Sequence, residues 1–213
     1  MASKTKTHLT WKIGRILALA GAVLLIVQNF LYYVAFFFSE ESGFQEILLQ
    51  ILFTLDLIGF LSLGFGFLAL GIGSKNLWSG LSGLAFLGWV GVTLSWRIQL
   101  DLWDQGWSSS LAVDDFSAFL EVIIDLLLLA SFLLGVAFGL FIVAFRPKPL
   151  FALFFVLYSG ANVIFVLLLI TLLLKILVLP AVGVLVFLVL FTIIQKAELV
   201  DKDPKKPQFP SSS

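Results

Sequence analysis

Residues 149–195 read PLFALFFVLYSGANVIFVLLLITLLLKILVLPAVGVLVFLVLFTIIQ, an apolar run that contains one charged side chain, Lys175. As a single α-helix this run would extend about 70 Å at 1.5 Å per residue, more than twice the hydrocarbon core of a membrane. It is therefore predicted to form a hairpin of two membrane-spanning helices with Lys175 at the turn. Pro180 then falls in the first turn of the returning helix, where a missing N–H donor is tolerated.

Similar apolar stretches precede this hairpin, and each supplies the about 20 residues that one helical crossing requires. With 61% hydrophobic residues the chain has no room for a soluble domain, because its longest non-spanning segment is an outer loop at 97–116. The sequence predicts an all-α, polytopic integral membrane protein with six transmembrane helices arranged as three hairpins. The predicted crossings, within one transmembrane domain at 16–195, are 16–38, 47–73, 76–96, 117–145, 149–173 and 176–195.

The basic residues predict the orientation of these helices. Of the 13 Lys and Arg residues, only Arg97 and Lys175 fall on the opposite side of the membrane from the rest. Positive charge accumulates on the cytoplasmic side of membrane proteins, so both termini are predicted to be cytoplasmic. Residues 1–15 would form a basic cytoplasmic segment, and 196–213, rich in Lys, Pro and Ser, a disordered cytoplasmic tail.

The composition also restricts the chemistry that the chain can carry. It has no Cys, which excludes disulfides, thiolate nucleophiles and Cys-ligated metals, and its one His, His8, lies in the N-terminal segment. Ser82 lies in a Gly-Leu-Ser-Gly sequence that resembles the serine motif of rhomboid proteases, but no His in the membrane could activate it. No cofactor, metal site or nucleic-acid partner is predicted, and the lipid bilayer is a predicted partner.

Two acidic residues, Asp56 and Asp125, stand out because each lies roughly 12 to 14 Å from the outer end of its predicted helix. A carboxylate at mid-helix costs about 2.5 to 3.5 kcal/mol on insertion scales, so it must be paired, protonated or facing water. Each is followed at the same spacing by Ser and Gly, which indicates a weak internal repeat. The pair is reminiscent of intramembrane aspartyl proteases, but the preceding residues, Leu55 and Ile124, do not match their motifs, and no enzymatic role is predicted.

Other polar residues in the same outer half could complete a site around the two aspartates. Glu121 lies one helical turn before Asp125 on the same face, and Arg97 is the nearest counter-charge. Two interpretations stay open: a structural clamp between helices, or an outward-facing site for a cation, a proton or a small solute. The candidate residues are Asp56, Asp125, Glu121, Arg97, Asn29 and Asn162, with Thr93 nearby.

Small residues at three- or four-residue spacing predict where helices pack closely, because such faces let backbones approach each other in lipid. The predicted packing residues are Gly59, Ser62, Gly66, Gly135 and Gly139. The first four helices are therefore expected to form a close bundle. The last two, with few small residues, are expected to face lipid or to dock against another subunit. Trp96, Trp103 and Trp107 are interpreted as part of an interfacial aromatic belt.

These features leave two function classes. In the first, which the small number of intramembrane polar groups favours, the chain is a non-catalytic accessory subunit of a membrane complex. Its hydrophobic 149–195 hairpin would dock against a membrane-protein partner or a second copy. In the second, it is a transport or binding component for a small solute, a cation or a proton. In size, helix number and predicted termini it resembles the substrate-binding subunits of energy-coupling-factor importers, and Ala18-x-x-x-Ala22 is similar to their docking motif.

Overall fold

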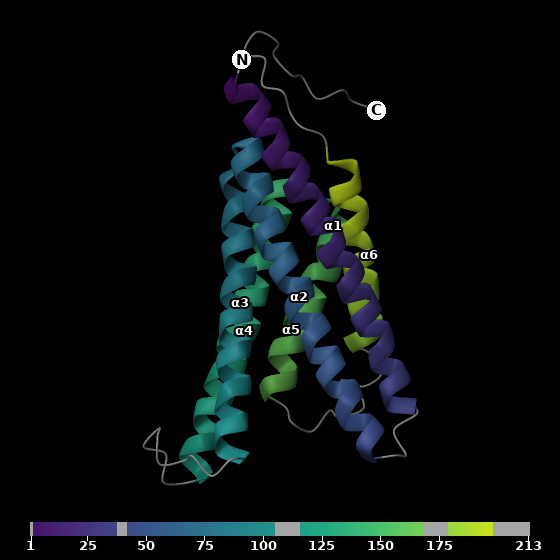
Figure 1. Ribbon diagram of the computed structural model, residues 1–213, viewed down its shortest axis with the longest axis vertical. Helices are drawn as coiled ribbons and strands as arrows, with labels where there is room; N and C mark the ends of the chain where they lie inside the picture. The colour runs from purple at the N-terminus through teal and green to yellow at the C-terminus, as the bar shows by residue number, and fades with distance from the viewer. Residues whose placement is uncertain (1, 38–41, 105–115, 168–178, 198–213) are drawn as a thin grey trace.

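The computed structural model describes residues 2–37, 42–104, 116–167 and 179–197, and within these ranges it contains helices and no strands (Figure 1). The prediction of an all-α fold with six helices is confirmed. The helices are α1 (Ala2–Phe37), α2 (Ser42–Ser74), α3 (Leu77–Asp104), α4 (Phe116–Phe145), α5 (Pro149–Leu167) and α6 (Leu179–Lys196).

Five of these helices, all except α5, are long and apolar enough to cross a membrane. The remaining helix is equally apolar, but its described apolar stretch, Pro149–Val163, is shorter. The chain is thus a multi-pass membrane protein by the length and composition of its helices. The side of the membrane on which the termini lie stays a prediction.

Several helices extend beyond their predicted crossings, and α1 and α3 do so the furthest. α1 begins at Ala2 and so includes most of the basic segment, and α3 continues to Asp104, into the predicted outer loop at 97–116. Arg97 and Asp101 explain part of this extension, because they form an ion pair of 3.2 Å at i, i+4 spacing, which favours helix. The rest of that loop, the predicted turn at Lys175 and the tail from 198 onward lie outside the described residues.

The helices form a closed ring, in which each packs against its neighbours in sequence and α1 packs against α6 (Figure 1). The side chain of Arg15 on α1 joins the two ends of this ring by donating a hydrogen bond to the carbonyl of Gln195 on α6. We call the end of the bundle at which α1 begins and α6 ends the basic end, because Lys75, Arg146 and Lys148 also lie in its turns. The opposite end is called the far end.

Tight turns connect the helices at the basic end. Lys75 and Arg146, which follow α2 and α4, both adopt the left-handed conformation, with φ of 54° and 46°. Asn76 then caps α3, since its Oδ1 accepts hydrogen bonds from backbone N–H groups of the first turn. Its Nδ2 donates to the carbonyl oxygen of Ala144 at 3.3 Å, which ties this turn to the end of α4.

Glycines bring α1 and α2 into backbone contact. A Cβ added to Gly66 would lie 2.5 Å from the backbone nitrogen of Ala18, and one added to Gly59 would lie 2.7 Å from Leu25. Ser62 is half-buried on the same helix. Ala18 and Ala22 are fully buried, so the alanine pair that is similar to a docking motif belongs to the interior of this bundle.

Gly135 and Gly139 on α4 lie in a more open environment. A Cβ on Gly135 would come no closer than 3.9 Å to Ser159 of α5, and one on Gly139 would meet nothing within 4 Å. Both glycines line an apolar groove between α4 and α5 with a volume of about 440 Å³. Gly135 and Gly139 thus leave a groove between α4 and α5, whereas Gly59 and Gly66 allow α1 and α2 to pack closely.

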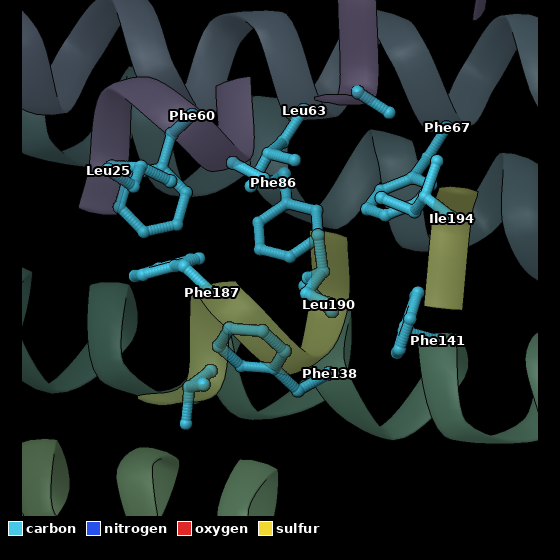
Figure 2. Close-up of a cluster of buried hydrophobic side chains, with 14 of the residues drawn as sticks. Leu25, Phe60, Leu63, Phe67, Phe86, Phe138, Phe141, Phe187, Leu190 and Ile194 are labelled. Atoms are coloured by element: carbon cyan, nitrogen blue, oxygen red, sulfur yellow. The ribbon is translucent and has the colours of Figure 1, made fainter. Parts of the chain in front are cut away.

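Buried aromatic side chains fill the centre of the ring, and Figure 2 shows Phe60, Phe86, Phe138 and Phe187 within this core. The ring of Phe86 contacts that of Phe138 edge-on, with centroids 5.4 Å apart, and Phe60 contacts Phe187 at 5.9 Å. Phe138 also stacks on Phe155 at 5.2 Å. These contacts cross the axis of the bundle, so side chains fill its middle.

α6 belongs to this core, which differs from the expectation that the last two helices face lipid. Val186, Phe187, Leu190 and Ile194 are all 0% exposed and form one stripe of the helix. Neighbouring Gly183 leaves space for α1, because a Cβ there would overlap the side chain of Asn29. The polar residues of α6 lie in its last two turns, so most of the helix gives no periodic signal of which face is inward, and this burial could not be predicted.

Candidate functional site

A cavity of about 240 Å³ lies in the far half of the ring and is lined by residues of α2, α3, α4, α5 and α6. We call it the Asp56 cavity, because Asp56 is the one charged residue among the described residues that line it. Its other polar side chains are Thr93, Ser131 and Asn162, and its aromatic walls are Phe53, Trp89 and Trp96. It is therefore a mainly apolar chamber with a single carboxylate.

Asp56 reaches this cavity because of its register on α2. Phe60 and Leu63, four and seven residues further along, lie on the same helix face and are buried in the aromatic core. Asp56 continues that inward stripe towards the far end, and its side chain is half-buried. It lies about 14 Å along the helix from Ile47, where the apolar span begins.

The side chains next to Asp56 on α5 are neutral. Tyr158 and Asn162 lie one helical turn apart on α5, and Asn162 lines the cavity. The Asn162 Nδ2 also donates to the backbone oxygen of Tyr158 at 2.8 Å. Asp56 and Asn162, two of the predicted site residues, are thus brought to the same cavity.

One face of α3 forms the opposite wall, where Trp89, Thr93 and Trp96 follow each other at helical spacing. The Trp89 ring packs against Phe60 with centroids 4.0 Å apart, so the wall of the cavity rests on the aromatic core. The Trp96 indole N–H is buried without a hydrogen-bond partner. An unpaired donor of this kind destabilises a fold by about 1–3 kcal/mol, which makes it a noteworthy group in the wall of a cavity.

Arg97, predicted to be the counter-charge of the aspartates, is directed elsewhere. Its Nε pairs with Asp101 of the same helix at 3.2 Å, and its guanidinium lies 5.7 Å from the centre of the Phe53 ring. It borders a second cavity with Phe53 and Thr54, separate from the Asp56 cavity. Both members of the ion pair are about half exposed, so the pair contributes at most about 1 kcal/mol.

Asp125 and Glu121 do not line the cavity. This differs from Asp56, although Asp56 on α2 and Asp125 on α4 are each followed by Ser and Gly at the same spacing. Ile123, Ala130 and Leu134 form the buried stripe of α4, and the two acidic residues lie on its exposed side. The two aspartates of the repeat therefore differ in environment, because Asp56 lines the cavity and Asp125 is exposed.

Asn29 is buried on α1, away from the cavity. Its Nδ2 donates to the backbone oxygen of Leu25 at 2.7 Å, and its side chain packs against Gly183 of α6. This contact matches a structural clamp between α1 and α6. Ser82 is likewise structural, because its buried hydroxyl donates to the backbone oxygen of Ala137 on α4 at 2.8 Å.

The rest of the cavity is less evident from the residue pattern. Trp96 is predicted to belong to an interfacial aromatic belt, whereas nothing in the pattern predicts a site role for Ser131, Trp89 or Phe53. The available signal was the placement of two Trp and one Thr on one face of α3, since a mixture of rings and a hydroxyl is unusual for a lipid-facing stripe.

Among the residues that the structure describes, no group of three or more His, Cys, Asp or Glu side chains could hold a metal ion. No family model matches the sequence, and no curated protein or solved structure is significantly similar to it.

Proposed function

We propose that this protein is a membrane component that binds a small cation in the Asp56 cavity, entering from the far end. The observation that carries the proposal is a carboxylate that faces a cavity of about 240 Å³ inside an apolar span, with no basic side chain among the described residues that line the cavity. A carboxylate in such a position requires a compensating charge or proton. A bound cation would supply that charge.

The electrostatics of the cavity favour cations over anions and neutral solutes. Attraction between opposite charges strengthens as the effective dielectric constant falls, and apolar side chains make up most of the cavity walls. The nearest arginine, Arg97, is occupied by Asp101. A structural clamp would instead be expected to join Asp56 directly to a donor on a neighbouring helix.

The aromatic core bears on the kind of component that is proposed. Rings such as Phe86 and Phe138 fill the bundle on the basic-end side of the cavity. A binding chamber that is closed on one side suits a carrier or a binding subunit better than an open channel. Release to the other side would then require the helices around the core to move.

The proposal can be tested by thermal unfolding of the purified protein with a panel of cations. The variants are Asp56→Asn and, as a matched control, Asp125→Asn, in which the same group is removed from the exposed side of α4. A ligand present at 100 times its Kd stabilises by about 2.7 kcal/mol, which is readily measured as a rise in Tm. We expect this rise in the wild type and in Asp125→Asn, and its loss in Asp56→Asn.

Asn preserves the size and hydrogen-bonding capacity of Asp but not its charge, so Asp56→Asn should still fold. Identical cation responses in the wild type and Asp56→Asn would remove the proposal.

A second candidate function, a subunit of a membrane complex, is favoured by a different observation. Glu121 and Asp125 are exposed on α4 within or beside its apolar span, and the same helix borders the open groove to α5. Because one face of α6 is buried in the core, a docking surface on the 149–195 hairpin would use α5 and only the exposed face of α6, where Leu185 and Leu188 lie. Native mass spectrometry after mild detergent extraction tests this alternative. A stoichiometric partner that is lost in Asp125→Asn would support it, and a monomer at native abundance would not.

A further inference from the structure

We propose that the ligand of the Asp56 cavity is a small organic ammonium ion, held between the Asp56 carboxylate and the aromatic rings of Trp89 and Trp96. This inference rests on the proposed function, since it names the class of cation that the same cavity takes. It follows from the contrast between the many rings and the few oxygen atoms in the cavity walls.

The walls offer few ligands for an inorganic cation. Such ions bind through several oxygen atoms, about six to eight for Ca²⁺, which replace their hydration shell. The side chains that could supply oxygen atoms here are Asp56, Thr93, Ser131 and Asn162, and they come from four different helices. No cluster of acidic side chains is present among the described residues. These few oxygen atoms would therefore replace the hydration shell of a metal ion only in part.

The same walls suit an alkylated ammonium head. Phe53, Trp89 and Trp96 contribute rings to a chamber that contains one carboxylate. Ring faces attract cations, Trp most strongly, and the attraction increases when water is excluded. Methyl or methylene groups on the nitrogen spread the charge and bury apolar surface, so an organic cation loses less hydration on entry than a bare ion does. Asp56 then neutralises the charge that the rings surround.

The size of the cavity restricts the ligand further. Its volume of about 240 Å³ is slightly below the ~300–1,000 Å³ that is typical of sites for drug-sized ligands. A compact amine with a short polar arm fits this space, and the hydroxyls of Thr93 and Ser131 could bind such an arm. Choline and tetramethylammonium are suitable probes of this class.

The test is calorimetric titration of the purified protein with choline, tetramethylammonium, Na⁺, K⁺ and 3,3-dimethyl-1-butanol, the neutral carbon analogue of choline. We expect the two organic cations to bind and the neutral analogue and inorganic ions not to bind. Trp89→Leu and Trp96→Leu should each weaken choline binding by about 5- to 30-fold, because a desolvated cation–ring contact contributes about 1–2 kcal/mol. Trp89→Phe, which keeps a ring, should lose less than Trp89→Leu.

Trp78→Leu is the matched control, because Trp78 is an exposed Trp of the same helix at the basic end, and it should leave binding unchanged. If Trp89→Leu does not fold, the comparison of Trp96→Leu with Trp89→Phe carries the test. Asp56-dependent binding of Na⁺, K⁺ or protons without binding of organic ammonium would overturn this inference and leave the proposed function intact. Absence of any Asp56-dependent binding would overturn both.

Discussion

Glycine residues that look alike in the sequence have opposite roles in this bundle. Gly66 lies where the α2 backbone touches that of α1, whereas Gly139 borders an open groove between α4 and α5. A methyl group would collide with Ala18 at the first position and would meet nothing at the second. The effect of adding one carbon therefore depends on the helix interface and not on the residue type.

Gly66→Ala should destabilise the protein by about 1–3 kcal/mol, because the helices must separate to admit the methyl group. Gly139→Ala should be neutral or stabilise by up to about 1 kcal/mol, since Ala is the better helix former and the site is open. Thermal unfolding in detergent, followed by circular dichroism, measures both changes. Equal losses of Tm in the two variants would contradict the close α1–α2 contact.

A second residue-scale prediction concerns the aromatic core. Phe187→Ala should destabilise by about 3–5 kcal/mol, because Phe187 is fully buried among Phe60, Phe138 and Tyr158 and its loss leaves a cavity. Phe132→Ala on α4 is the control, since that side chain is 64% exposed. The Tm of each variant gives the comparison, and a similar loss in both would show that α6 does not pack inside the ring.

The two aspartates show how far residue patterns predict a site. Spacing along a helix predicts which residues share a face, and depth predicts that a carboxylate needs compensation. Neither predicts which face is turned inward, because in lipid both the core and the surface of a helix are apolar. The sequence pattern predicts both aspartates as candidate site residues, but only Asp56 lines the cavity, whereas Asp125, at matched spacing, lies on the exposed side of α4.

At the scale of the elements, hydropathy and length predicted the helices because the thickness of a membrane limits both. Their ends were less predictable. The charged residues after Trp96 suggested a loop, but Arg97 and Asp101 pair along the helix and α3 continues to Asp104. Local i, i+4 pairing favours helix even where the composition is polar. A change to polar residues therefore predicts where the membrane span ends, but it does not predict where the helix ends.

The turn between α2 and α3 gives a prediction at this scale. Lys75 has a φ of 54°, a conformation that is unfavourable by roughly 1–2 kcal/mol for residues with a Cβ, so Lys75→Gly should raise the Tm. Asn76→Ala should lower stability by about 0.5–2 kcal/mol, because it removes the cap of α3 and the link to Ala144. Opposite shifts in thermal unfolding are expected from adjacent residues. Shifts of the same sign would contradict the geometry of this turn.

For the whole molecule, closure of the ring determines where a ligand can enter. α6 returns to pack against α1, and aromatic rings fill the space that the six helices enclose. The Asp56 cavity lies in the far half of this ring. The biological meaning of the cavity therefore depends on which side of the membrane the far end faces.

That orientation can be measured directly, because the chain contains no native Cys and single-cysteine variants need no background removal. Ser3→Cys and Ala197→Cys place thiols at the two ends of the described chain at the basic end, and Ser109→Cys places one in the predicted outer loop. The positive-inside distribution predicts that a membrane-impermeant maleimide labels only Ser109→Cys in intact cells, and all three variants after permeabilisation. Labelling of Ser3→Cys or Ala197→Cys from outside would show that the topology is the reverse of the predicted one. The Asp56 cavity would then take its cation from the cytoplasm, and ligand should stabilise the protein only when it is supplied on that side of a sealed vesicle.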